Sequence, residues 1–363
     1  MSTLIIEVCA VEEIAPIQDA DRIERIRVKN WWCVSGKGHY KVGDKAVYVP
    51  PDSLISKDLA ERWGISKYCS PVKDNGVNVE GFRVRACRFR GMASFGTIQD
   101  PDDSSWPIGH DVKEHYGITK YETPMRSNEG DSASPLAAFH AYTSIENIGN
   151  FPNVFSENEE VVITEKIHGT NSRVGLSING RDVEFMAGSH SVRRKEFNDA
   201  GVRSRYWLPF NLNPESCSLR NLLNKIWLSQ SASKSVIVFG EIFGAGIQDM
   251  TYGFNGVFFR VFDIAVDSTY LDYDVAKEYL KDTGIELVPL LYRGPFSMNK
   301  VNQLVDGPTT VCDPSAIKSS FKGREGVVIK SAKERFDCNF GGRAILKAIS
   351  ADYLSRRNGT EFH

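Results

Sequence analysis

The sequence lacks the features of a membrane-spanning or secreted protein. No hydrophobic run among its 363 residues approaches the length that crosses a bilayer. No basic region precedes the first apolar stretch, Leu4 to Ile6, so the amino terminus does not resemble a signal peptide. Seven cysteines without a C-x-x-C pair argue against structural zinc and favour reduced thiols. We therefore expect a protein of the cytoplasm or another reducing intracellular compartment, without a membrane partner.

The sequence also lacks an excess of positive charge. Its 44 Lys and Arg residues are offset by 46 Asp and Glu residues, which gives a formal net charge of −2. Bulk attraction to nucleic acid is thereby excluded, so a polynucleotide must bind through local basic patches. The length and the hydrophobic fraction of 41% are sufficient for two domains with cores of their own.

The most informative segment is Lys166-Ile167-His168-Gly169-Thr170-Asn171, which follows the apolar residues 161–163. It places a lysine at the entrance of a tight, glycine-containing turn, where a covalent nucleophile is able to sit. A lysine attacks only when neighbouring cations or desolvation favour its neutral form. The hexapeptide by itself is equally compatible with an ordinary β-turn that carries a surface lysine.

Four further segments place charged or aromatic residues on apolar strands. They are Phe239 to Gly244, Phe258 to Ile264, Arg324 to Lys330, and Ala344 to Lys347. Glu241 and Glu325 lie at strand ends, where carboxylates suit a hard divalent cation beside a triphosphate. Lys330 and Lys347 would supply positive charge to a phosphate. Taken singly, each of these two glutamates and two lysines is also compatible with a solvated surface residue.

In this order, the five segments resemble the covalent nucleotidyltransferase superfamily of ATP-dependent ligases and mRNA capping enzymes, specifically its RNA ligase branch. His168 stands where DNA ligases and capping enzymes usually have aspartate, which points to RNA. The resemblance implies ATP and Mg²⁺ or Mn²⁺ as cofactors, and a three-step reaction. Lys166 takes AMP from ATP, AMP passes to a 5′-phosphate, and a 3′-hydroxyl displaces AMP.

The resemblance also implies roles for single residues. Lys330 and Lys347 would act on the α-phosphate, and Glu241 and Glu325 would hold the metal. The other expected nucleotide contacts are His168 and Asn171 at the metal shell, ribose or phosphate, Glu165 and the Ile167 backbone at the adenine edge, and a phenylalanine ring stacked on the purine. For that ring the sequence favours Phe259, with Phe258 and Phe262 as alternatives and core packing as the competing role.

Two positions depart from the family pattern. His190 stands where a basic residue that faces phosphate is expected, so this contact shifts to Arg193 or Arg194, which are equally compatible with a solvated loop. Many relatives have two lysines separated by one residue in the fifth segment, whereas this chain has Lys347 followed by Ile349. Either Lys330 supplies the missing charge or one step depends more on the metal.

The first third of the chain reads as a small all-β module. Its alternating runs are joined by glycine-containing turns, and it resembles the OB-type module at the front of one subgroup of RNA ligases. The segment 81–91 is expected to form one strand that alternates arginine with apolar residues and binds nucleic acid. An edge strand guarded by charge is the alternative. The candidate contacts are Arg83, Arg85, Arg88 and Arg90.

These observations predict an OB-like module at 1–120, a linker at 121–136 and a catalytic domain at 137–363. The fold class is α+β, an OB-like β-barrel followed by an antiparallel-sheet adenylyltransferase domain of the ATP-grasp-like ligase type. Helices are expected at 219–230 and 273–283, the second between the N-cap Asp272 and Gly284.

The layout ranks the competing functions. DNA ligases and capping enzymes carry an OB domain after the fifth segment, but only 16 residues follow Lys347. We therefore predict a monomeric RNA ligase that acts on RNA or on a nicked RNA/DNA duplex with RNA on the 3′-hydroxyl side. The alternatives are a DNA ligase of unusual layout, a transferase that stops at AMP-lysine, and a nucleic-acid-binding protein with an inactive ligase domain.

Overall fold

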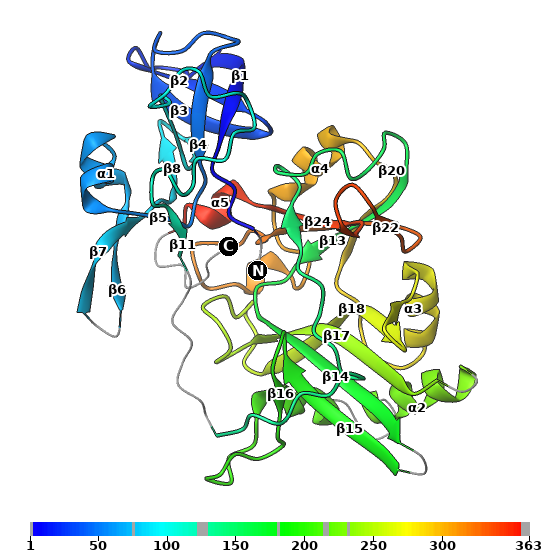
Figure 1. Ribbon diagram of the computed structural model, residues 1–363. Helices are drawn as coiled ribbons and strands as arrows, with labels where there is room; N and C mark the ends of the chain where they lie inside the picture. Colours follow the sequence, from blue (N-terminus) through cyan, green and yellow to red (C-terminus); the bar gives the residue numbers. More distant parts are fainter. Residues whose placement is uncertain are drawn as a thin grey trace. The chain divides into compact units, whose positions relative to one another are not determined.

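The chain divides into two compact units that alternate along the sequence. The computed structural model describes residues 3–74, 77–121, 130–179, 182–212, 218–230 and 233–356. Unit 1 comprises Met1–Met125, Glu146–Pro152 and Ala351–His363, and unit 2 comprises Arg126–Ile145 and Asn153–Ser350. Figure 1 labels the elements of each unit. Most of the predicted linker, residues 122–129, lies outside the described residues, and the sequential domain boundaries stay a prediction.

An antiparallel sheet in the order β10-β4-β1-β2-β3 forms the OB-like part of unit 1. Along β2 every second side chain is buried, as expected for a strand with one face on a core, and Ile26 and Val28 are fully buried. Contacts between β3 and β10 nearly close the sheet into a barrel. The strands are β1 (Glu7–Pro16), β2 (Ile23–Val28), β3 (Trp31–Gly36), β4 (Lys45–Val49) and β10 (Thr97–Gln99).

A second sheet in unit 1 has the order β11-β5-β7-β6, and a separate hairpin pairs β8 with β9. The bounds are β5 (Ser53–Ile55), β6 (Ser70–Asp74), β7 (Val77–Arg83), β8 (Ala86–Phe89), β9 (Met92–Phe95) and β11 (Thr119–Lys120). The short elements of this unit are α1 (Lys57–Arg62), η1 (Ser66–Tyr68), β12 (Glu146–Asn147) and α5 (Ala351–Leu354). Ser56 caps α1, since its side chain accepts a hydrogen bond from the Leu59 amide at 3.1 Å.

The prediction of one continuous basic strand at 81–91 is wrong. The strand β7 ends at Arg83 and β8 begins at Ala86, so the four arginines have different surroundings. Arg83, whose side chain is 13% exposed, forms an ion pair with buried Asp52, with Nε 2.7 Å from Oδ1. Arg85 reaches Ser70, and Arg88 donates to Asp352 and Ser355. Arg90 is exposed in the hairpin turn, at a positive φ of 49°.

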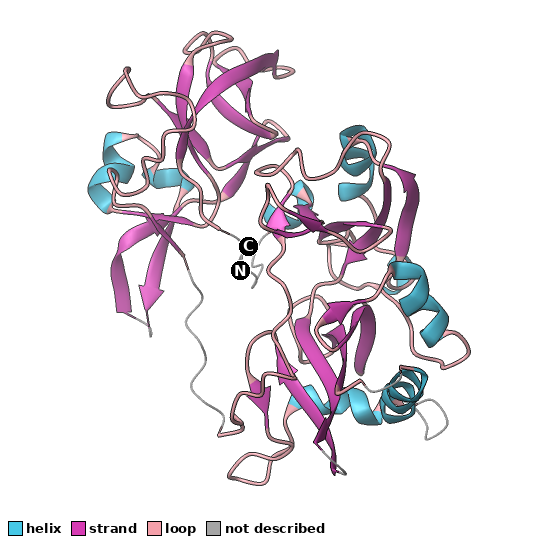
Figure 2. Ribbon diagram, turned by 45° about the vertical axis from the view of Figure 1, so that its right-hand side comes forward, coloured by secondary structure: helices cyan, strands magenta, loops and turns pink. Residues whose placement is uncertain are grey.

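In unit 2, a six-stranded antiparallel sheet carries helices on one face (Figure 2). Its order is β16-β15-β14-β17-β18-β19. Side chains such as Val174, Val238 and Ile264 pack with Leu223 of α2 and Leu280 of α3. The bounds are β14 (Thr170–Asn179), β15 (Asp182–Ser189), β16 (Arg193–Arg194), β17 (Ser235–Gly244), β18 (Val257–Val266), β19 (Thr269–Tyr270), η2 (Arg205–Asn211), α2 (Leu219–Ser229) and α3 (Tyr273–Leu280).

The second sheet of unit 2 has the order β24-β21-β13-β20 and packs against the other face of the first. Ile237 and Phe239 of β17 share one core cluster with Ile345 of β24 and Val328 of β21, so the two sheets enclose this core. The bounds are β13 (Glu160–Lys166), β20 (Leu290–Pro295), β21 (Gly326–Ser331), β22 (Phe336–Asp337), β23 (Gly342–Arg343), β24 (Ile345–Ile349), α4 (Met298–Val305) and η4 (Pro314–Ala316).

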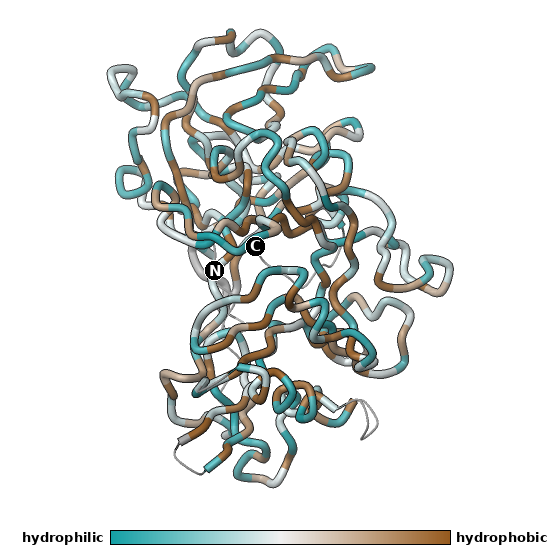
Figure 3. Tube along the Cα trace, turned by 90° about the vertical axis from the view of Figure 1, so that its right-hand side faces the viewer, coloured by the Kyte–Doolittle hydropathy of each residue, from teal (hydrophilic) through white to brown (hydrophobic). Residues whose placement is uncertain are grey.

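Hydropathy follows this arrangement. Figure 3 shows hydrophobic stretches of the trace, in brown, in the interior, and hydrophilic stretches, in teal, at many of its outer bends. The two predicted helices are present as α2 and α3, and Gly284 follows α3 at a positive φ of 71°. Asp272 stands at the predicted N-cap position of α3, but its side chain makes no cap hydrogen bond and instead accepts from the Glu334 amide at 2.7 Å. No helix within the described ranges is long and apolar enough to cross a membrane.

Replacing Asp52 by alanine should lower the free energy of unfolding by about 3 kcal/mol, because the largely covered Arg83 side chain loses the carboxylate that balances its charge. The measurement is urea unfolding followed by tryptophan fluorescence. Glu12→Ala is the matched control, since Glu12 pairs with Arg27 at 3.9 Å on the surface and its loss should cost about 0.5 kcal/mol. Equal effects of the two substitutions would contradict a structural role for Asp52 and Arg83.

Candidate active site

The turn that carries the lysine joins the two sheets of unit 2. The strand β13 ends at Lys166 and β14 begins at Thr170, so residues 167–169 cross from one sheet to the other. Gly169 is required here because a Cβ atom on it would lie 2.2 Å from the Ile242 carbonyl oxygen. The crossing therefore places a lysine at the edge of the space between two packed sheets.

Lys166 lies beside a fully buried carboxylate. Its Nζ donates to Oε1 of Glu325, whose side chain has no exposed surface, while the Lys166 side chain remains 23% exposed. The pairing of Lys166 with Gly326 in the sheet brings Glu325, the residue before β21, to this position. The sequence predicted both residues at the site, and the structure brings them into contact.

His168 links this carboxylate to a second one. The buried imidazole lies with Nε2 2.7 Å from Oδ1 of Asp249 and with Nδ1 3.8 Å from Oε2 of Glu325. Its backbone amide donates to the Tyr252 hydroxyl at 2.6 Å. Burial raises the pKa of Tyr252 well above its usual value, so this phenol stays protonated. The side chain of His168 is thus fixed between two carboxylates, which limits its rotation.

Glu241 lies on the sheet opposite to Glu325. It pairs with Asn171 of β14 and with Arg260 of β18, and residues paired directly across neighbouring strands share a face of the sheet. Asn171, Glu241 and Arg260 therefore form one row beside the Lys166 turn. Glu241 is half-buried, so its carboxylate is partly accessible.

The register of the second sheet also places the predicted lysines on one face. Lys166 lies opposite Gly326, which lies opposite Ile349, and the next row contains Lys347. Ile349 consequently occupies the same row as Lys166. Gly326 lies between these two residues and contributes no side chain. Lys347 stands one row away, on the same face.

Lys330 shares that face but does not join Lys166. It pairs with Val162, four positions along β13 from Lys166. Its Nζ lies 2.6 Å from Asp263 Oδ1 and donates to the Phe262 carbonyl at 3.2 Å. The expected contact of Lys330 with the α-phosphate therefore finds no support in its position.

Asp263 is the centre of a buried polar cluster between the two sheets. Its second oxygen accepts from the Tyr142 hydroxyl at 2.5 Å and from Arg343 Nη2 at 3.1 Å. Burial by itself would raise the pKa of Asp263, but the charges of Lys330 and Arg343, with hydrogen bonds from Lys330 and Tyr142, hold it below the usual range. The carboxylate is therefore charged and balanced by two cations.

Phe259, the predicted stacking ring, lies on the helix-facing side of the first sheet, away from Lys166. Phe259 packs with the helix-facing cluster that includes Val261 and Ile285. Phe262 instead packs with Tyr142 and Val328 between the two sheets, on the side of Lys166. A β-bulge at Phe239/Gly240 inserts Phe262 as an extra residue in β18, which shifts the alternation that the sequence argument assumed.

Glu165 is buried on the opposite face of β13. Its carboxylate accepts from the Thr310 amide and the Thr310 hydroxyl, both at 2.6 Å, and from the Thr309 hydroxyl. Only 1% of the residue is exposed. The adenine-edge role of Glu165 and of the Ile167 backbone stays a prediction, and for Glu165 it requires the loop at Thr309 to release these hydrogen bonds.

The basic segment near His190 is paired with carboxylates. Arg193 donates to Glu184 and Arg194 donates to Asp131, whose residue is 2% exposed. Burial, together with the nearby charge of Arg173, lowers the pKa of His190. An imidazole in this position is neutral near pH 7, so it is not the missing cation. The phosphate contact of Arg193 or Arg194 stays a prediction.

A divalent cation fits this site only if a substrate supplies some of its ligands. Within the described residues, no group of three or more His, Cys, Asp or Glu side chains forms a complete metal cage. Glu325 and Glu241 still offer carboxylate oxygens on the two facing sheets. Mg²⁺ is usually held by one or two carboxylates together with phosphates and water, which is the kind of site that this donor set allows.

Sequence reasoning missed Asp249, Tyr252, Asp263 and Thr310. Asp249 and Tyr252 lie in the loop that follows the glutamate strand, outside any apolar pattern, so no periodicity marks them. Asp263 carried a signal, because a charged residue inside the apolar strand Val257–Val266 must find a buried partner. That partner, Lys330, was present among the predicted residues but had been given another role.

An OB-like unit and a lysine held by a buried carboxylate between two antiparallel sheets are features of the nucleotidyltransferase superfamily that the sequence indicated. The RNA ligase family model matches residues 159–349, and an OB-fold domain model matches residues 5–101. The chain belongs to the RNA ligase family, and it is therefore an enzyme that joins RNA. The prediction of the family, and of an OB module ahead of the ligase domain, is confirmed.

Solved structures of the RNA ligase of Naegleria gruberi resemble the whole chain. The structure with PPi has a TM-score of 0.72 at 25% identity and covers 97% of this chain and 98% of that chain. A glutamate-to-alanine mutant with ATP and Mn has a TM-score of 0.73 at 25% identity, covering 97% and 98%. A lysine-to-methionine mutant with AMP and Mn has 0.71 at 25%, covering 96% and 98%. No curated protein sequence matches the chain.

Replacing Asp263 by asparagine should make the stability of the protein less dependent on pH. A carboxyl group whose pKa is lower in the folded state stabilises the fold above its unfolded pKa, about 4, and this contribution is lost as the pH falls through the lower folded value. Urea unfolding between pH 7 and pH 2.5 should show a steeper acid loss for the wild type. Asp199→Asn, at an exposed site, is the control that should retain the wild-type profile. Identical profiles for wild type and Asp263→Asn would contradict this account.

Proposed function

We propose that this RNA ligase joins 3′-hydroxyl and 5′-phosphate ends through an AMP adduct on Lys166. The observation that carries the proposal is the contact of Lys166 with buried Glu325 at the junction of two sheets. ATP is the proposed AMP donor, because structures of the Naegleria gruberi enzyme contain ATP and Mn, and AMP and Mn. The adduct itself, the metal and the preferred substrate belong to the proposal.

In the first step, Lys166 Nζ attacks the α-phosphorus of ATP. The N–P bond forms, the bond from this phosphorus to its bridging oxygen breaks, and pyrophosphate leaves. An ammonium has no lone pair for this attack, so Nζ must first lose a proton. In the resting arrangement, Glu325 holds Nζ as the partner of an ion pair. When Glu325 is drawn away from Nζ, the ammonium loses the charge that stabilises it and gives its proton to solvent, which frees the lone pair for attack.

His168 and Asp249 position Glu325 during this change. The imidazole lies between the two carboxylates and is anchored through its backbone amide to Tyr252. Mg²⁺ or Mn²⁺ held by Glu325 and Glu241 with phosphate oxygens would neutralise the charge that develops on the phosphates. Lys347, one row from Lys166, is the proposed cation for the α-phosphate. Asn171 extends from the row of Glu241 toward the nucleotide ribose or phosphate.

Phe262 is the proposed stacking ring for adenine, with Val328 on the opposite side. Both side chains lie in the core between the two sheets, on the face that carries Lys166. The carbonyl of Phe262 accepts a hydrogen bond from Lys330, and the next residue is Asp263. Lys330 thus orients the strand that bears the ring. This role replaces its predicted contact with the α-phosphate.

The two later steps transfer AMP and seal the RNA. A 5′-phosphate oxygen attacks the phosphorus of the adduct, which breaks the N–P bond and returns Lys166 Nζ to its free form. A 3′-hydroxyl then attacks the adenylylated 5′-phosphorus, and AMP leaves. We propose a nicked duplex with RNA on the 3′-hydroxyl side as the substrate, since the histidine at position 168 is typical of the RNA branch. The enzyme acts as a monomer.

Lys166→Ala should lose the AMP adduct completely, because the bond forms at its Nζ, while the fold is retained. The measurement is incubation with α-labelled ATP and Mg²⁺ or Mn²⁺, followed by denaturing electrophoresis. Lys281→Ala removes a surface lysine that is 64% exposed and should label like the wild type. A labelled band on Lys166→Ala would refute the assignment of the nucleophile.

Glu325→Gln should reduce the rate of adduct formation by at least about 100-fold, since the amide neither pairs with the Lys166 ammonium nor holds a divalent cation well. Rates at increasing Mn²⁺ concentration separate these roles, because a lost metal contact shifts the Mn²⁺ dependence. Glu278→Gln, at a glutamate of the same unit whose side chain is 76% exposed, is the matched control. Wild-type labelling by Glu325→Gln would contradict the proposal.

Chasing the labelled protein with nicked duplexes tests the substrate. Two duplexes that differ only in an RNA or a DNA strand at the 3′-hydroxyl side are compared. Transfer of label into sealed product with the RNA strand alone supports the proposed nick preference. Equal sealing of the DNA strand would overturn that preference without affecting the assignment of Lys166.

A further inference from the structure

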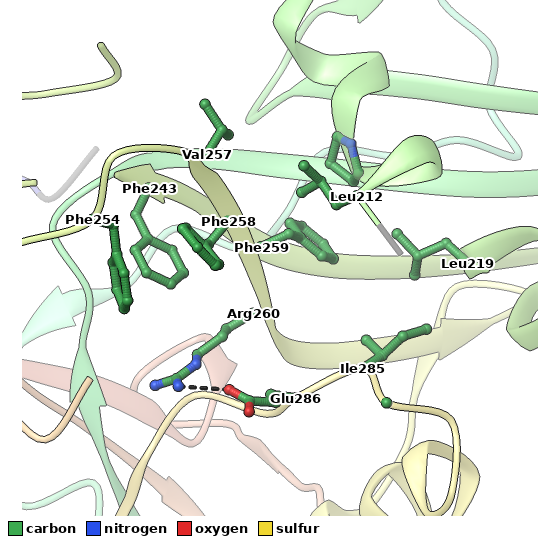
Figure 4. A pocket seen from close by; sticks show the side chains of 12 residues that line it. Leu212, Leu219, Phe243, Phe254, Val257, Phe258, Phe259, Arg260, Ile285 and Glu286 are labelled. Atoms are coloured by element: carbon green, nitrogen blue, oxygen red, sulfur yellow. Dashed lines mark ion pairs between the residues drawn. The ribbon is translucent and has the colours of Figure 1, made fainter. Parts of the chain in front are cut away.

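A pocket of about 370 Å³ opens beside β18, outside the proposed nucleotide site. Figure 4 shows its walls from close by. Phenylalanine rings and aliphatic side chains make up most of its lining residues, and Arg260 and Glu286 add charged groups, so both polar and apolar surface faces the pocket. Pockets of this volume are typical of sites for small molecules or their parts.

Three aromatic rings form one wall of the pocket. The ring centroids of Phe254 and Phe258 are 4.3 Å apart, and those of Phe243 and Phe258 are 6.0 Å apart. Phe258 is 42% exposed, which is unusual for a large apolar side chain held by two neighbours. An accessible flat ring on a rigid aromatic base is the surface on which a nucleobase stacks.

The polar side of the pocket offers both donors and an acceptor. Arg260 Nη2 lies 2.5 Å from Glu286 Oε2, and the Glu286 side chain is 65% exposed while that of Arg260 is 17% exposed. The dashed line in Figure 4 marks this ion pair. A guanidinium beside a carboxylate matches the edge of a base, which presents acceptor and donor groups side by side.

Two strands and one ring contact link the pocket lining to the proposed reaction site. Arg260 pairs with Glu241 across the sheet, and Phe243 follows Glu241 by two positions and so shares its face. Phe243 also contacts Tyr252, with ring centroids 5.7 Å apart, and the Tyr252 hydroxyl accepts from the His168 amide. An aromatic path thus connects the pocket with the turn that carries Lys166.

We propose that this pocket binds an unstacked nucleobase of the RNA substrate close to the ends that are joined. The base stacks on Phe258, while Arg260 and Glu286 hydrogen-bond to its edge. The inference rests on the proposed ligase function and names a substrate contact for it. Stacking needs no particular base, whereas the Arg260–Glu286 pair favours guanine, whose edge offers O6 as an acceptor and N1–H and N2–H as donors.

Phe258→Ala tests the stacking contact in the full-length protein. We expect the AMP adduct to form at the wild-type rate and the KM for a nicked RNA duplex to rise about tenfold, as for the loss of one stacked base. Phe336→Ala removes another exposed ring of the same unit, outside the pocket lining, and should leave the KM unchanged. A thermal unfolding curve for each variant shows that both are folded.

Abasic substrates locate the base and decide the proposal. Duplexes with one abasic nucleotide at each position near the nick are sealed by wild type and by Phe258→Ala. At the position whose base enters the pocket, the abasic change should raise the wild-type KM about tenfold and should add nothing in the variant. Glu286→Gln should reduce the preference for guanine at that position.

Three outcomes would overturn the inference. The first is an unchanged KM for every nicked duplex with Phe258→Ala. The second is that, at every position, the abasic change raises the KM of Phe258→Ala by the same factor as the KM of the wild type, because then no base contacts the ring. The third is slower adduct formation or a raised KM for ATP, which would assign the ring to adenine. Loss of adduct in Lys166→Ala is independent of all three outcomes, so failure of this inference is distinguishable from failure of the ligase assignment.

Discussion

The architecture of unit 2 depends on one buried charge. Asp263 stands in the first sheet and binds Lys330 of the second sheet, while Arg343 and Tyr142 complete its hydrogen bonds. A buried carboxylate without such partners would cost several kcal/mol, so the sheets pack only where the cations reach it. This requirement fixes their alignment, and the turn with Lys166 joins the two aligned sheets. The geometry at the nucleophile therefore follows from a contact several residues away along the strand.

The site combines elements that are individually ordinary. Lys166, Glu325 and His168 come from a turn and from the start of a strand, and Glu241 comes from the facing sheet. What distinguishes them is that a lysine, an imidazole and two carboxylates lie close together at the edge of the space between the two packed sheets. Low dielectric between the layers strengthens each charge interaction. The aromatic rings from Tyr252 to Phe258 extend this region outward, so ring contacts connect the proposed base pocket with the turn that carries Lys166.

The sequence was sufficient for the family, the fold class, the OB module ahead of the ligase domain, and the choice of Lys166 and Glu325 as site residues, but not for their contact. The departures from its other expectations have local physical causes. A bulge in β18 turns Phe262 rather than Phe259 to the side of Lys166, and alternation cannot reveal an inserted residue. Lys330 appeared to be a free cation because its partner Asp263 is 67 residues distant in sequence. The predicted arginine strand divides after Arg83. Arg83 forms an ion pair with Asp52, which the local alternation of apolar residues does not reveal.

The turn that crosses between the sheets also couples catalysis to folding. Until both sheets have formed and packed, Lys166 has neither Glu325 beside it nor His168 fixed in place, and it is an ordinary lysine on a flexible chain. On the proposed mechanism, a chain whose two sheets have not packed is unable to form the AMP adduct, although Lys166 is already present. Folding of unit 2 is thus a precondition of the proposed chemistry.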